Sequence, residues 1–390
     1  MVGEVDRQKK IRVALVGLGF GAEFVPIYLH HPYVENLTLC DSNQAILDAT
    51  GDKFDVGRRT ADLASVLASD QIDAVHLVTP IPYHAQQTIA VLNSGKHCAC
   101  TVPMATSLED LKAIVRARGQ NGKVYMGMET AVYTRRFLYV REMVQHGEIG
   151  RIQFLRGAHY QDMEGWPAYW MGLPPMHYAT HAVSPVLALA NTRARAVHCL
   201  GSGQMRPELF AQYQNPFPVE SMIMELDSPT PLAAEITRSL FHTARGYSES
   251  FNVYGEKAAF EWQQIEDELP VVFRVQGPSQ PHAGNVIAME RVSVPDRPDL
   301  LPKEIARFTV RGVYDENNPH LSFLQGGGHD GSHPHLVHEF LSSIAEGRQP
   351  YPDAVTTANW TAAGICGHLS AMNNGERVEV PSFDQYARKT

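Results

Sequence analysis

The sequence feature that most constrains the fold is a buried strand that runs directly into a glycine-rich turn. Residues 11–17 are apolar at nearly every position, which is typical of a parallel strand covered on both faces. Residues 17–22 read Gly-Leu-Gly-Phe-Gly-Ala and match the pattern G-x-G-x-x-A, and a helical pattern follows them to about His30. Strand, glycine turn and helix in this order predict the first unit of a doubly wound α/β domain.

The alternation of strand and helix continues over about 125 residues. Helices are expected at residues 83–94 and from Ser107, where Asp110 completes a capping box. Further strands are expected at residues 37–41, 74–79, 96–101 and 124–128. Such alternation predicts a parallel sheet with helices on both faces, so the fold class is α/β with an N-terminal Rossmann domain over residues 1–127.

The pattern changes after residue 127. Alternating or β-branched segments are expected to form strands at residues 152–162, 222–226, 232–237, 251–254 and 378–380. Helical patterns occupy residues 137–146, 335–346 and 356–373. Residues 277–335 are rich in Pro, Gly, His and Asn and are expected to be loops. Residues 128–390 are therefore expected to form a C-terminal α+β domain on an open, mostly antiparallel sheet, which binds substrate and mediates oligomerisation.

Composition narrows the class of protein and its partners. A chain of 390 residues, with 44% apolar and 19% charged residues, is typical of a two-domain globular enzyme. A formal net charge of −9 without a polybasic run argues against nucleic acid and anionic membranes as partners. No apolar run is long enough to span a bilayer, and the first ten residues lack the apolar core of a signal peptide. Five cysteines without a disulfide framework predict reduced thiols and a cytoplasmic location.

The glycine turn predicts a dinucleotide site. Its glycines allow a tight bend and close approach of the backbone to a pyrophosphate, and the helix that follows offers N–H donors to the phosphates. Asp41 ends the second predicted strand, where a carboxylate can accept hydrogen bonds from the adenosine ribose. Because Ser42 and Asn43 bring no arginine for a 2′-phosphate, NAD is expected rather than NADP. The expected cofactor-binding residues in these segments are Gly17, Gly19, Phe20, Gly21, Ala22, Asp41, Ser42, Thr79, Pro80 and His84.

The glycine turn, the Thr79-Pro80 strand end, residues 94–97 and the late helix pair together resemble the Gfo/Idh/MocA oxidoreductases. In that family a Glu-Lys-Pro turn closes a late strand of the cofactor domain, and its lysine touches the reacting hydroxyl. Here Val102 stands in the place of the lysine, before Pro103. The resemblance implies that Val102, Pro103 and Glu129 lie beside the cofactor. The missing lysine points away from simple net oxidation.

A narrower resemblance is to glycoside hydrolase family 109. The segments that resemble this family are residues 128–135, 143–150, 157–162, 178–181 and 328–331, and Val102-Pro103 fits it as well. Residues 178–181 read Tyr-Ala-Thr-His where the family has Tyr-Pro-Thr-His, and Asp330 replaces a glycine. These departures indicate a related group whose substrate need not be the same.

The resemblance implies a hydrolase that uses NAD without net redox change. Hydride leaves C3 of the sugar to NAD, the ketone acidifies the C2 proton, and removal of that proton eliminates the C1 substituent. Water then adds, and NADH returns the hydride. Carbanion formation beside a carbonyl is easier than cleavage of an unactivated acetal, so the usual carboxylate pair is not required.

The resemblance also assigns roles to particular residues. His181 matches the histidine of both branches of the family and is expected to take the C3 hydroxyl proton. Tyr178 lies three residues earlier, on the same face of a helix, and is expected to handle the C2 proton or the leaving group. A structural role in the core is the alternative for both. The expected substrate-binding residues are Glu129, Tyr133, Arg135, Tyr160, Asp162, His177 and His329.

Several clusters leave alternatives open. His177 with His181, and residues 329–338 with four histidines, have spacings that could bind a metal, but no carboxylate or cysteine spacing reinforces them and no metal site is expected. Trp166, Tyr169 and Trp170 form either a sugar-stacking lid or a packed loop. A set of basic residues could supply an anion-binding fork, which makes an anionic glycoside such as a sulfoquinovoside a candidate substrate. They are Arg135, Arg136, Arg156, Arg238, His242 and Arg245.

Two other functions compete with the hydrolase. The first is an NAD-dependent sugar or cyclitol dehydrogenase in which another group replaces the lysine. The second is a non-catalytic NAD-binding sensor. Because the open sheet of the second domain commonly pairs in this family, a homodimer or homotetramer is expected.

Overall fold

The fold was analysed in a computed structural model that describes residues 10–325 and 329–387. The N-terminal segment 1–9 and Gly328 of the late histidine motif lie outside these residues. The chain divides into two compact units. The first contains the chain up to Tyr133, Asp296–Ala358 and the residues from Ser382, and the second contains Thr134–Pro295 and Asn359–Pro381.

This division differs from the single boundary that we expected after residue 127. The chain returns to the first unit after Pro295, because α10 (Ser332–Glu346) packs on α1 (Val25–His30) and on the turn after β1 (Ile11–Val16). The helix α11 (Ala354–Met372) is shared between the units.

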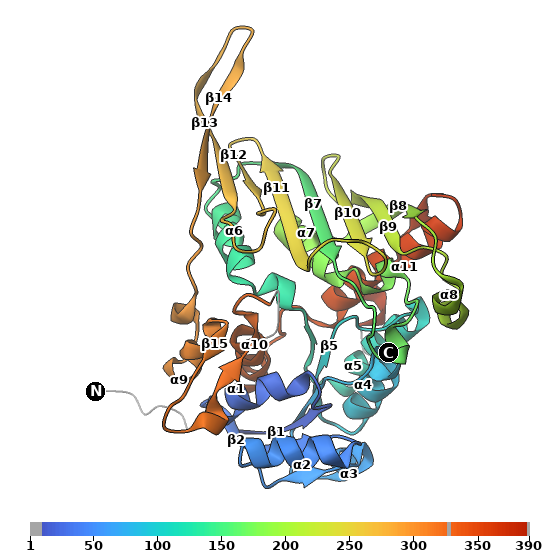
Figure 1. The fold of residues 1–390 in the computed structure, drawn as a ribbon, viewed down its shortest axis with the longest axis vertical. Coiled ribbons are helices and arrows are strands. Elements are labelled where there is room, and N and C mark those ends of the chain that lie inside the picture. The colour runs from blue at the N-terminus through green and yellow to red at the C-terminus, as the bar shows by residue number, and fades with distance from the viewer. Residues whose placement is uncertain (1–9, 326–328, 388–390) are drawn as a thin grey trace. The chain divides into compact units, whose positions relative to one another are not determined.

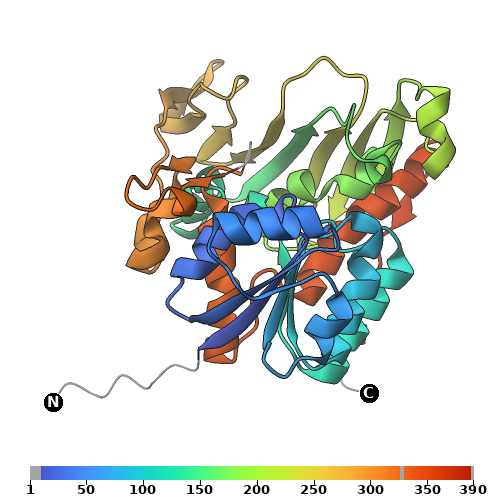
Figure 2. The same cartoon turned by 60° about the horizontal axis from the view of Figure 1, so that its bottom comes forward.

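The first unit is built on a six-stranded parallel sheet with the order β3-β2-β1-β4-β5-β6. The other strands are β2 (Val34–Cys40), β3 (Arg59–Thr60), β4 (Ala74–Leu77), β5 (His97–Thr101) and β6 (Tyr125–Met128). Figures 1 and 2 show these blue-to-cyan strands with helices on both faces. The strand order reverses between β1 and β4, which is the switch point where doubly wound sheets bind their ligands.

The helices that follow Asn43, Asp62 and Ser107 in the first unit begin at side-chain caps. The Ser107 hydroxyl accepts the Asp110 N–H at 3.1 Å, which confirms Ser107 as the N-cap; the Asp110 carboxylate accepts from that hydroxyl at 2.7 Å rather than from the Ser107 N–H that a capping box uses. Asn43 caps the helix after β2, accepting the N–H groups of Ala45 and Ile46 at 3.0 and 3.3 Å. The remaining helices of this unit are α2 (Gln44–Lys53), α3 (Leu63–Ala68), α4 (His84–Asn93), α5 (Leu108–Asn121) and α9 (Lys303–Ala306).

The second unit is built on a nine-stranded sheet with the order β14-β13-β12-β11-β7-β10-β9-β8-β17, in which β7 and β10 are parallel and the other neighbours antiparallel. The strands are β7 (Ile152–Tyr160), β8 (Ala194–Ser202), β9 (Val219–Leu226), β10 (Ala233–Ser239), β11 (Ser248–Gly255), β12 (Ala258–Glu261), β13 (Val271–Gln280), β14 (Gly284–Arg291) and β17 (Val378–Glu379). The helices α6 (Arg135–Gln145), α7 (Thr180–Ala190) and α8 (Pro207–Tyr213) belong to the same unit. The α7 helix packs on β7, β10 and β11, so it covers the centre of the sheet.

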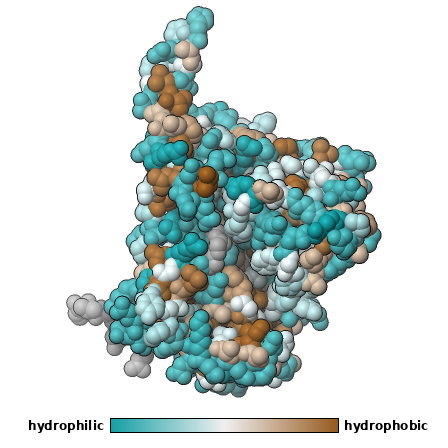
Figure 3. Space-filling view, in the orientation of Figure 1, coloured by the Kyte–Doolittle hydropathy of each residue, from teal (hydrophilic) through white to brown (hydrophobic). Residues whose placement is uncertain are grey.

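The expectation of loops over residues 277–335 was wrong for residues 277–291, whereas residues 292–325 contain only elements of two to four residues among turns and bends. β13 and β14 form a long hairpin arm that extends from the sheet, as Figure 1 shows. Most of the arm is exposed on both faces. Its sequence therefore lacks the alternation of apolar and polar residues that predicts a half-buried strand. Hydrophobic side chains gather near its base in Figure 3, and Val286, Ile287 and Met289 of β14 are exposed.

No helix among the described residues is long and apolar enough to cross a membrane.

Candidate active site

The glycine turn after β1 is shaped by close contact with the end of β4. Gly17 has φ +89°, and a Cβ there would stand 2.3 Å from the Val78 carbonyl oxygen. At Gly21 a Cβ would lie 3.3 Å from the Val78 side chain, so Gly21 is the residue that packs against β4, a role that the pattern assigns to Ala22. Gly19 has no neighbour within 4 Å of the corresponding point, which leaves its backbone open to a ligand.

Asp41 ties this turn to the next strand. Its Oδ2 accepts the Leu18 N–H at 2.7 Å, and its Oδ1 accepts the Asn43 N–H at 2.8 Å. Each carboxylate oxygen keeps a second lone pair for a ribose hydroxyl. Ser42 beside it is exposed. The turn, Asp41 and the lack of an arginine at positions 42 and 43 therefore fit NAD.

His84 lies one step behind the expected cofactor surface. It is buried, with Nδ1 2.7 Å from the Pro103 carbonyl oxygen and Nε2 2.8 Å from the Thr79 carbonyl oxygen. Burial opposes a charged ring, but the Cys100 thiol and the two carbonyls outweigh it and raise the pKa of His84 to about 9. Two carbonyl acceptors suit a doubly protonated imidazole. His84 therefore joins the segments after β4 and β5, and it would act on a cofactor through Thr79 and Pro103.

The residues at the ends of β5 and β6 are largely buried. Val102, in the place of the family lysine, is 8% exposed and precedes a cis Pro103. Glu129 is fully buried, and its Oε1 accepts the Ala131 N–H at 3.1 Å, which caps a short helix. Tyr133 donates its hydroxyl to the Tyr351 carbonyl at 2.6 Å. Glu129 and Tyr133 thus have structural partners in the first unit.

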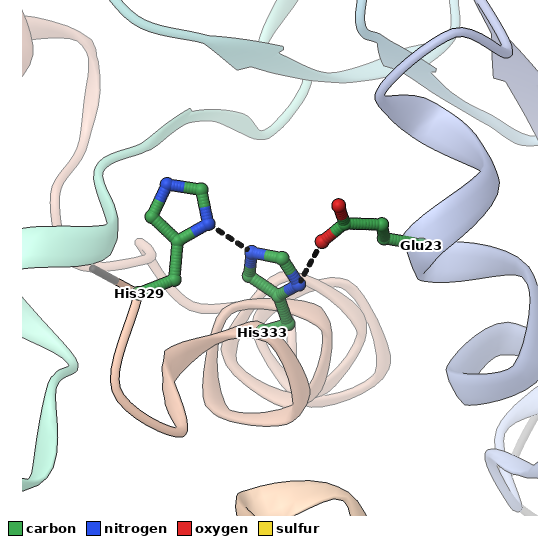
Figure 4. A group of neighbouring side chains, drawn as sticks. All are labelled: Glu23, His329 and His333. Atoms are coloured by element: carbon green, nitrogen blue, oxygen red, sulfur yellow. Dashed lines mark hydrogen bonds and ion pairs between the residues drawn. The ribbon is translucent and has the colours of Figure 1, made fainter. Parts of the chain in front are cut away.

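His329 stands next to the glycine turn in the first unit. Its ring packs edge-on against Phe20 at 5.3 Å between centroids. Its Nδ1 lies 2.9 Å from Nε2 of His333, whose Nδ1 lies 3.6 Å from a carboxylate oxygen of Glu23, as Figure 4 shows.

The second unit brings the two expected catalytic side chains together. His181 is the second residue of α7, and its Nε2 lies 3.1 Å from the Tyr178 hydroxyl. Tyr178 belongs to a separate 3-10 turn, Pro175–Tyr178, so the shared helix that we expected is wrong although the contact exists. The rings of Trp170 and Tyr178 pack edge to face with their centroids 4.8 Å apart. Trp170 of the expected lid or packed loop therefore belongs to this cluster.

A row of buried polar residues lies in register across the sheet on four neighbouring strands. Glu249 on β11 is opposite His159 on β7, which is opposite Arg238 on β10, which is opposite Glu220 on β9. None of the four is more than 5% exposed. A Glu249 oxygen lies 3.9 Å from Nε2 of both His159 and His181 and accepts the Tyr247 hydroxyl. The row therefore brings a carboxylate to the Tyr178–His181 pair.

The other end of the polar row holds the turn that carries Tyr178. Arg238 donates from Nε to the Tyr178 carbonyl at 2.8 Å, and burial lowers the pKa of this guanidinium to about 10. Glu220 accepts the Met176 N–H at 2.8 Å and pairs with His368 at 2.7 Å. These contacts fix the backbone on which Tyr178 depends.

Other expected substrate residues are not gathered around this pair by any described contact. The His177 ring packs on His368, and burial together with His368 lowers its pKa to about 3. Asp162 accepts the Glu164 N–H at 3.1 Å, and the Tyr160 ring lies under Arg245. Arg135 begins α6.

The basic residues of the expected anion fork have partners of their own. Arg238 donates three further ways into the protein, including to the Gln161 side chain at 2.9 Å, and Arg156 pairs with Glu235 at 3.0 Å. Arg136 lies over the Trp262 ring at 4.9 Å. These three side chains are not arranged as a free fork.

The polar row was missed by sequence reasoning, although β11 carries a signal. Its buried positions alternate as Glu249, Phe251 and Val253, so the acidic residue stands on the apolar face. An acid in the apolar phase of an amphipathic strand is expensive unless it has partners, and this makes it a site candidate.

The chain is similar in sequence to known NAD-binding proteins. Residues 11–128 match the model of the Gfo/Idh/MocA oxidoreductase family with its NAD-binding Rossmann fold. The chain is 23% identical over 401 residues to a glycosyl hydrolase family 109 protein of Bacteroides thetaiotaomicron, covering 96% of this chain and 84% of that protein. It is 28% identical over 418 residues to another from Shewanella baltica, covering 97% and 86%.

Solved structures show the same fold. A levoglucosan dehydrogenase in complex with NADH and levoglucosan superposes with a TM-score of 0.75 at 20% identity, covering 96% of this chain and all of that one. The myo-inositol 2-dehydrogenase of Lactobacillus plantarum gives 0.70 at 17% identity with the same coverage. Residues 11–128 therefore match the NAD-binding Rossmann fold of the Gfo/Idh/MocA oxidoreductases, and nearly the whole chain is similar to glycosyl hydrolase family 109 proteins.

Proposed function

We propose that this protein is an NAD-dependent glycoside hydrolase that works by transient oxidation at sugar C3, elimination at C1, addition of water and re-reduction, with no net redox change. The similarity to glycosyl hydrolase family 109 proteins supports this reading, as it spans both units of the chain. The coarser statement, an NAD-dependent enzyme that acts on sugars, is common to these relatives and to the dehydrogenases of the same fold.

The observation that carries the proposal is the contact of Tyr178 with His181 beside Glu249. His181 Nε2 is 3.1 Å from the Tyr178 hydroxyl and 3.9 Å from a Glu249 oxygen. A proton taken by His181 at Nε2 creates a cation, which the carboxylate stabilises. Tyr178 can pass a proton to or from the same nitrogen. The pair can thus serve successive proton transfers, which elimination and addition both need.

The first unit would hold the cofactor through the backbone around Gly19 and the Asp41 carboxylate. When bound, NAD supplies a reversible hydride acceptor, which is what a transient oxidation requires. Val102 offers an apolar side chain where the dehydrogenase pattern has an ammonium group. Because no lysine is present there to stabilise a C3 oxyanion, proton handling rests on His181 and Tyr178.

We further propose that the expected substrate-binding residues contact the sugar in the working enzyme. In the described structure Glu129, Tyr133 and His177 have protein partners, as do His329, Tyr160 and Asp162, so a bound sugar would have to add to these contacts or replace them. An anionic glycoside such as a sulfoquinovoside stays within the proposal. Any anion site must then use groups other than Arg156 and Arg238.

The test is incubation of the purified protein with NAD in D₂O and a panel of neutral and anionic aryl glycosides. Aglycone release with deuterium at C2 and no net NADH is the expected result. Tyr178→Phe keeps the packing of the ring and removes the hydroxyl, so we expect it to fold normally and to lose most of the turnover. NADH build-up without bond cleavage would replace the hydrolase with the sugar or cyclitol dehydrogenase.

The same assay, together with a His181→Ala variant, distinguishes a non-catalytic sensor from the two enzymes. A non-catalytic NAD-binding protein would show neither aglycone release nor oxidised sugar, and His181→Ala would leave its ligand response intact.

A homo-oligomer, dimer or tetramer, is also part of the proposal. The exposed Val286, Ile287 and Met289 on β14 provide apolar surface of the kind that pairs with a second copy. Light scattering of the native protein, compared with a Met289→Lys variant, tests it: a monomer in both would refute it.

A further inference from the structure

Three titratable side chains form a line beside the glycine turn of the first unit. Glu23 lies in the short helix Gly21–Phe24 that follows the turn, His333 is the second residue of α10, and His329 lies in the loop before it. Figure 4 shows the His333 ring between the other two side chains. Its Nδ1 faces a Glu23 oxygen at 3.6 Å and its Nε2 faces Nδ1 of His329 at 2.9 Å.

The arrangement of the three side chains suits a hydrogen-bonded row better than a metal site. Ligand atoms of the three residues lie within 4.8 Å of one another, a spacing that a metal ion could use. A single ion, however, binds one nitrogen of an imidazole, and here the two nitrogens of His333 engage different neighbours on opposite sides of the ring. A common centre would require His333 to turn and to break its hydrogen bond to His329.

The carboxylate selects one tautomer of His333. A neutral imidazole carries one N–H and one lone pair. With the proton on Nδ1, the N–H dipole points at the Glu23 oxygen; with the proton on Nε2, a lone pair would face the carboxylate and repel it. Burial, with His329 and His76 nearby, lowers the pKa of His333 well below its usual value, so the ring carries a single proton near neutral pH.

The tautomer of His333 determines which nitrogen of His329 carries a proton. If His333 is protonated on Nδ1, its Nε2 is an acceptor, and the hydrogen bond of 2.9 Å requires an N–H on Nδ1 of His329. The lone pair of His329 then lies on Nε2. The same logic, a carboxylate that orients an imidazole, prepares bases in other enzymes.

The aromatic residues of the glycine turn clamp both rings. Phe20 packs on His329 and His333 at 5.3 and 5.6 Å, and Phe24 stacks on His333 at 4.5 Å. Gly331, at φ +84°, would place a Cβ 2.4 Å from the Thr309 carbonyl oxygen, so the turn that delivers His329 to this clamp is tightly seated. The array is thus part of the expected cofactor turn.

We propose that Glu23 and His333 hold His329 in the tautomer whose Nε2 accepts a proton, making His329 a second base beside the cofactor turn. In this step the O–H bond of a substrate hydroxyl or water breaks, an N–H bond forms on Nε2, and the electron pair stays on the oxygen. The positive charge is shared through His333 toward Glu23. His333 and Glu23 are positioning residues, and the role of the base rests on the proposed function.

The array has titratable and charged neighbours on several elements. His333 faces Glu23, His329 and His76. On the other elements packed against α10, His31 bonds to His338 and Arg307 bonds to His30, while Glu129 caps its own turn.

The tautomers can be measured without substrate. Protein labelled with ¹⁵N-histidine gives two-bond proton–nitrogen patterns that distinguish Nδ1–H from Nε2–H, and His329→Gln and His333→Gln assign the two rings. We expect Nδ1–H for both in the native protein. In Glu23→Leu the acceptor opposite Nδ1 of His333 is removed, so both rings should lose their fixed Nδ1–H and show a mixture of tautomers, whereas the matched exposed variant Glu35→Leu should leave them unchanged.

Three outcomes would overturn the array. The first is an Nε2–H proton on His329 in the native protein, and the second is a pair of tautomers that does not change in Glu23→Leu. The third, from a separate titration, is binding of one equivalent of Zn²⁺ that disappears in His329→Gln, which would identify a metal site instead.

Turnover separates the array from the proposed function. With an active glycosidase, we expect His329→Ala to lower kcat at least tenfold and added imidazole to restore part of it, and full activity of His329→Ala would remove the role of base. If the native protein cleaves no glycoside, the proposed function fails, and the tautomers still decide whether the array exists.

Discussion

The α7 helix approaches the sheet closely at Gly157, and replacing this glycine should displace the proposed catalytic pair, Tyr178 and His181. A Cβ at Gly157 would stand 2.1 Å from the Ala182 carbonyl oxygen and 2.9 Å from its carbon. Both atoms belong to the α7 backbone, one residue beyond His181, so no side chain can rotate to relieve the contact. Gly157→Ala therefore forces β7 and α7 apart.

The size of the effect follows from the distance. Real Cβ contacts lie above 3.0 Å, so α7 must retreat by roughly 0.9 Å, from 2.1 to 3.0 Å. Overpacking of this kind costs about 1–3 kcal/mol, which is a fall of about 2–12 °C in Tm for a unit of this size. A shift near 1 Å in a catalytic group can cost about 100-fold in rate, so kcat should fall about that much.

The assay compares Gly157→Ala with Gly246→Ala in thermal unfolding and in turnover. Gly246 lies in the same unit, has no neighbour within 4 Å of its Cβ point and lacks a positive φ, so its variant should match the native protein. A Gly157→Ala protein with native Tm and native kcat would refute the argument that this contact seats α7.

Other perturbations test separate parts of the structure. Gly17→Ala should abolish NAD binding in a fluorescence titration and lower Tm, because its Cβ would stand 2.3 Å from a backbone oxygen at φ +89°; unchanged NAD affinity would contradict this. Burial lowers the pKa of His31 and of His76 to about 3, and at His31 the neighbouring His338 contributes to the shift. In the unfolded state both rings titrate near pH 6.5, so below that pH the unfolded state binds more protons than the folded state. The free energy of unfolding therefore decreases as the pH falls from 6.5 toward 3. Urea unfolding at pH 7 and pH 5 should show a loss of about 2 kcal/mol for each of these rings, and a His76→Phe protein should show a smaller loss than the native one.

The first unit was the more predictable half of the chain. The strands β1 and β4 are buried at most positions, and α2, α3 and α5 start at the polar caps Asn43, Asp62 and Ser107, so the local sequence and the fold agree there. The second unit is harder because its sheet uses half-exposed strands, and β8 and β12–β14 were not expected at all. The return of residues 296–358 to the first unit is a long-range packing effect that no local pattern reveals.

The candidate site shows the same limit. A motif points to His181 and Tyr178, but their partner Glu249 lies about 70 residues away and is brought to them by strand register. His84 was expected at the cofactor because of its place in the sequence, and its ring instead bonds to two backbone carbonyls. Sequence position predicts which segment reaches a site, whereas the direction of a side chain depends on the partners it finds.

The outer part of the hairpin arm makes few contacts with the rest of its sheet. β12 pairs with β13 from Val271 to Arg274, and the Val275 N–H donates to the Lys257 carbonyl at 2.9 Å. Beyond Val275, the strand pairing found among the described residues joins β13 to β14 only. Opening of that part breaks no contact with α7 or the polar row, and its amides should exchange with solvent well before those of β7. A change in the length of the arm would therefore leave α7 and the polar row in place, and an assembly built on the arm would change independently of the proposed chemistry.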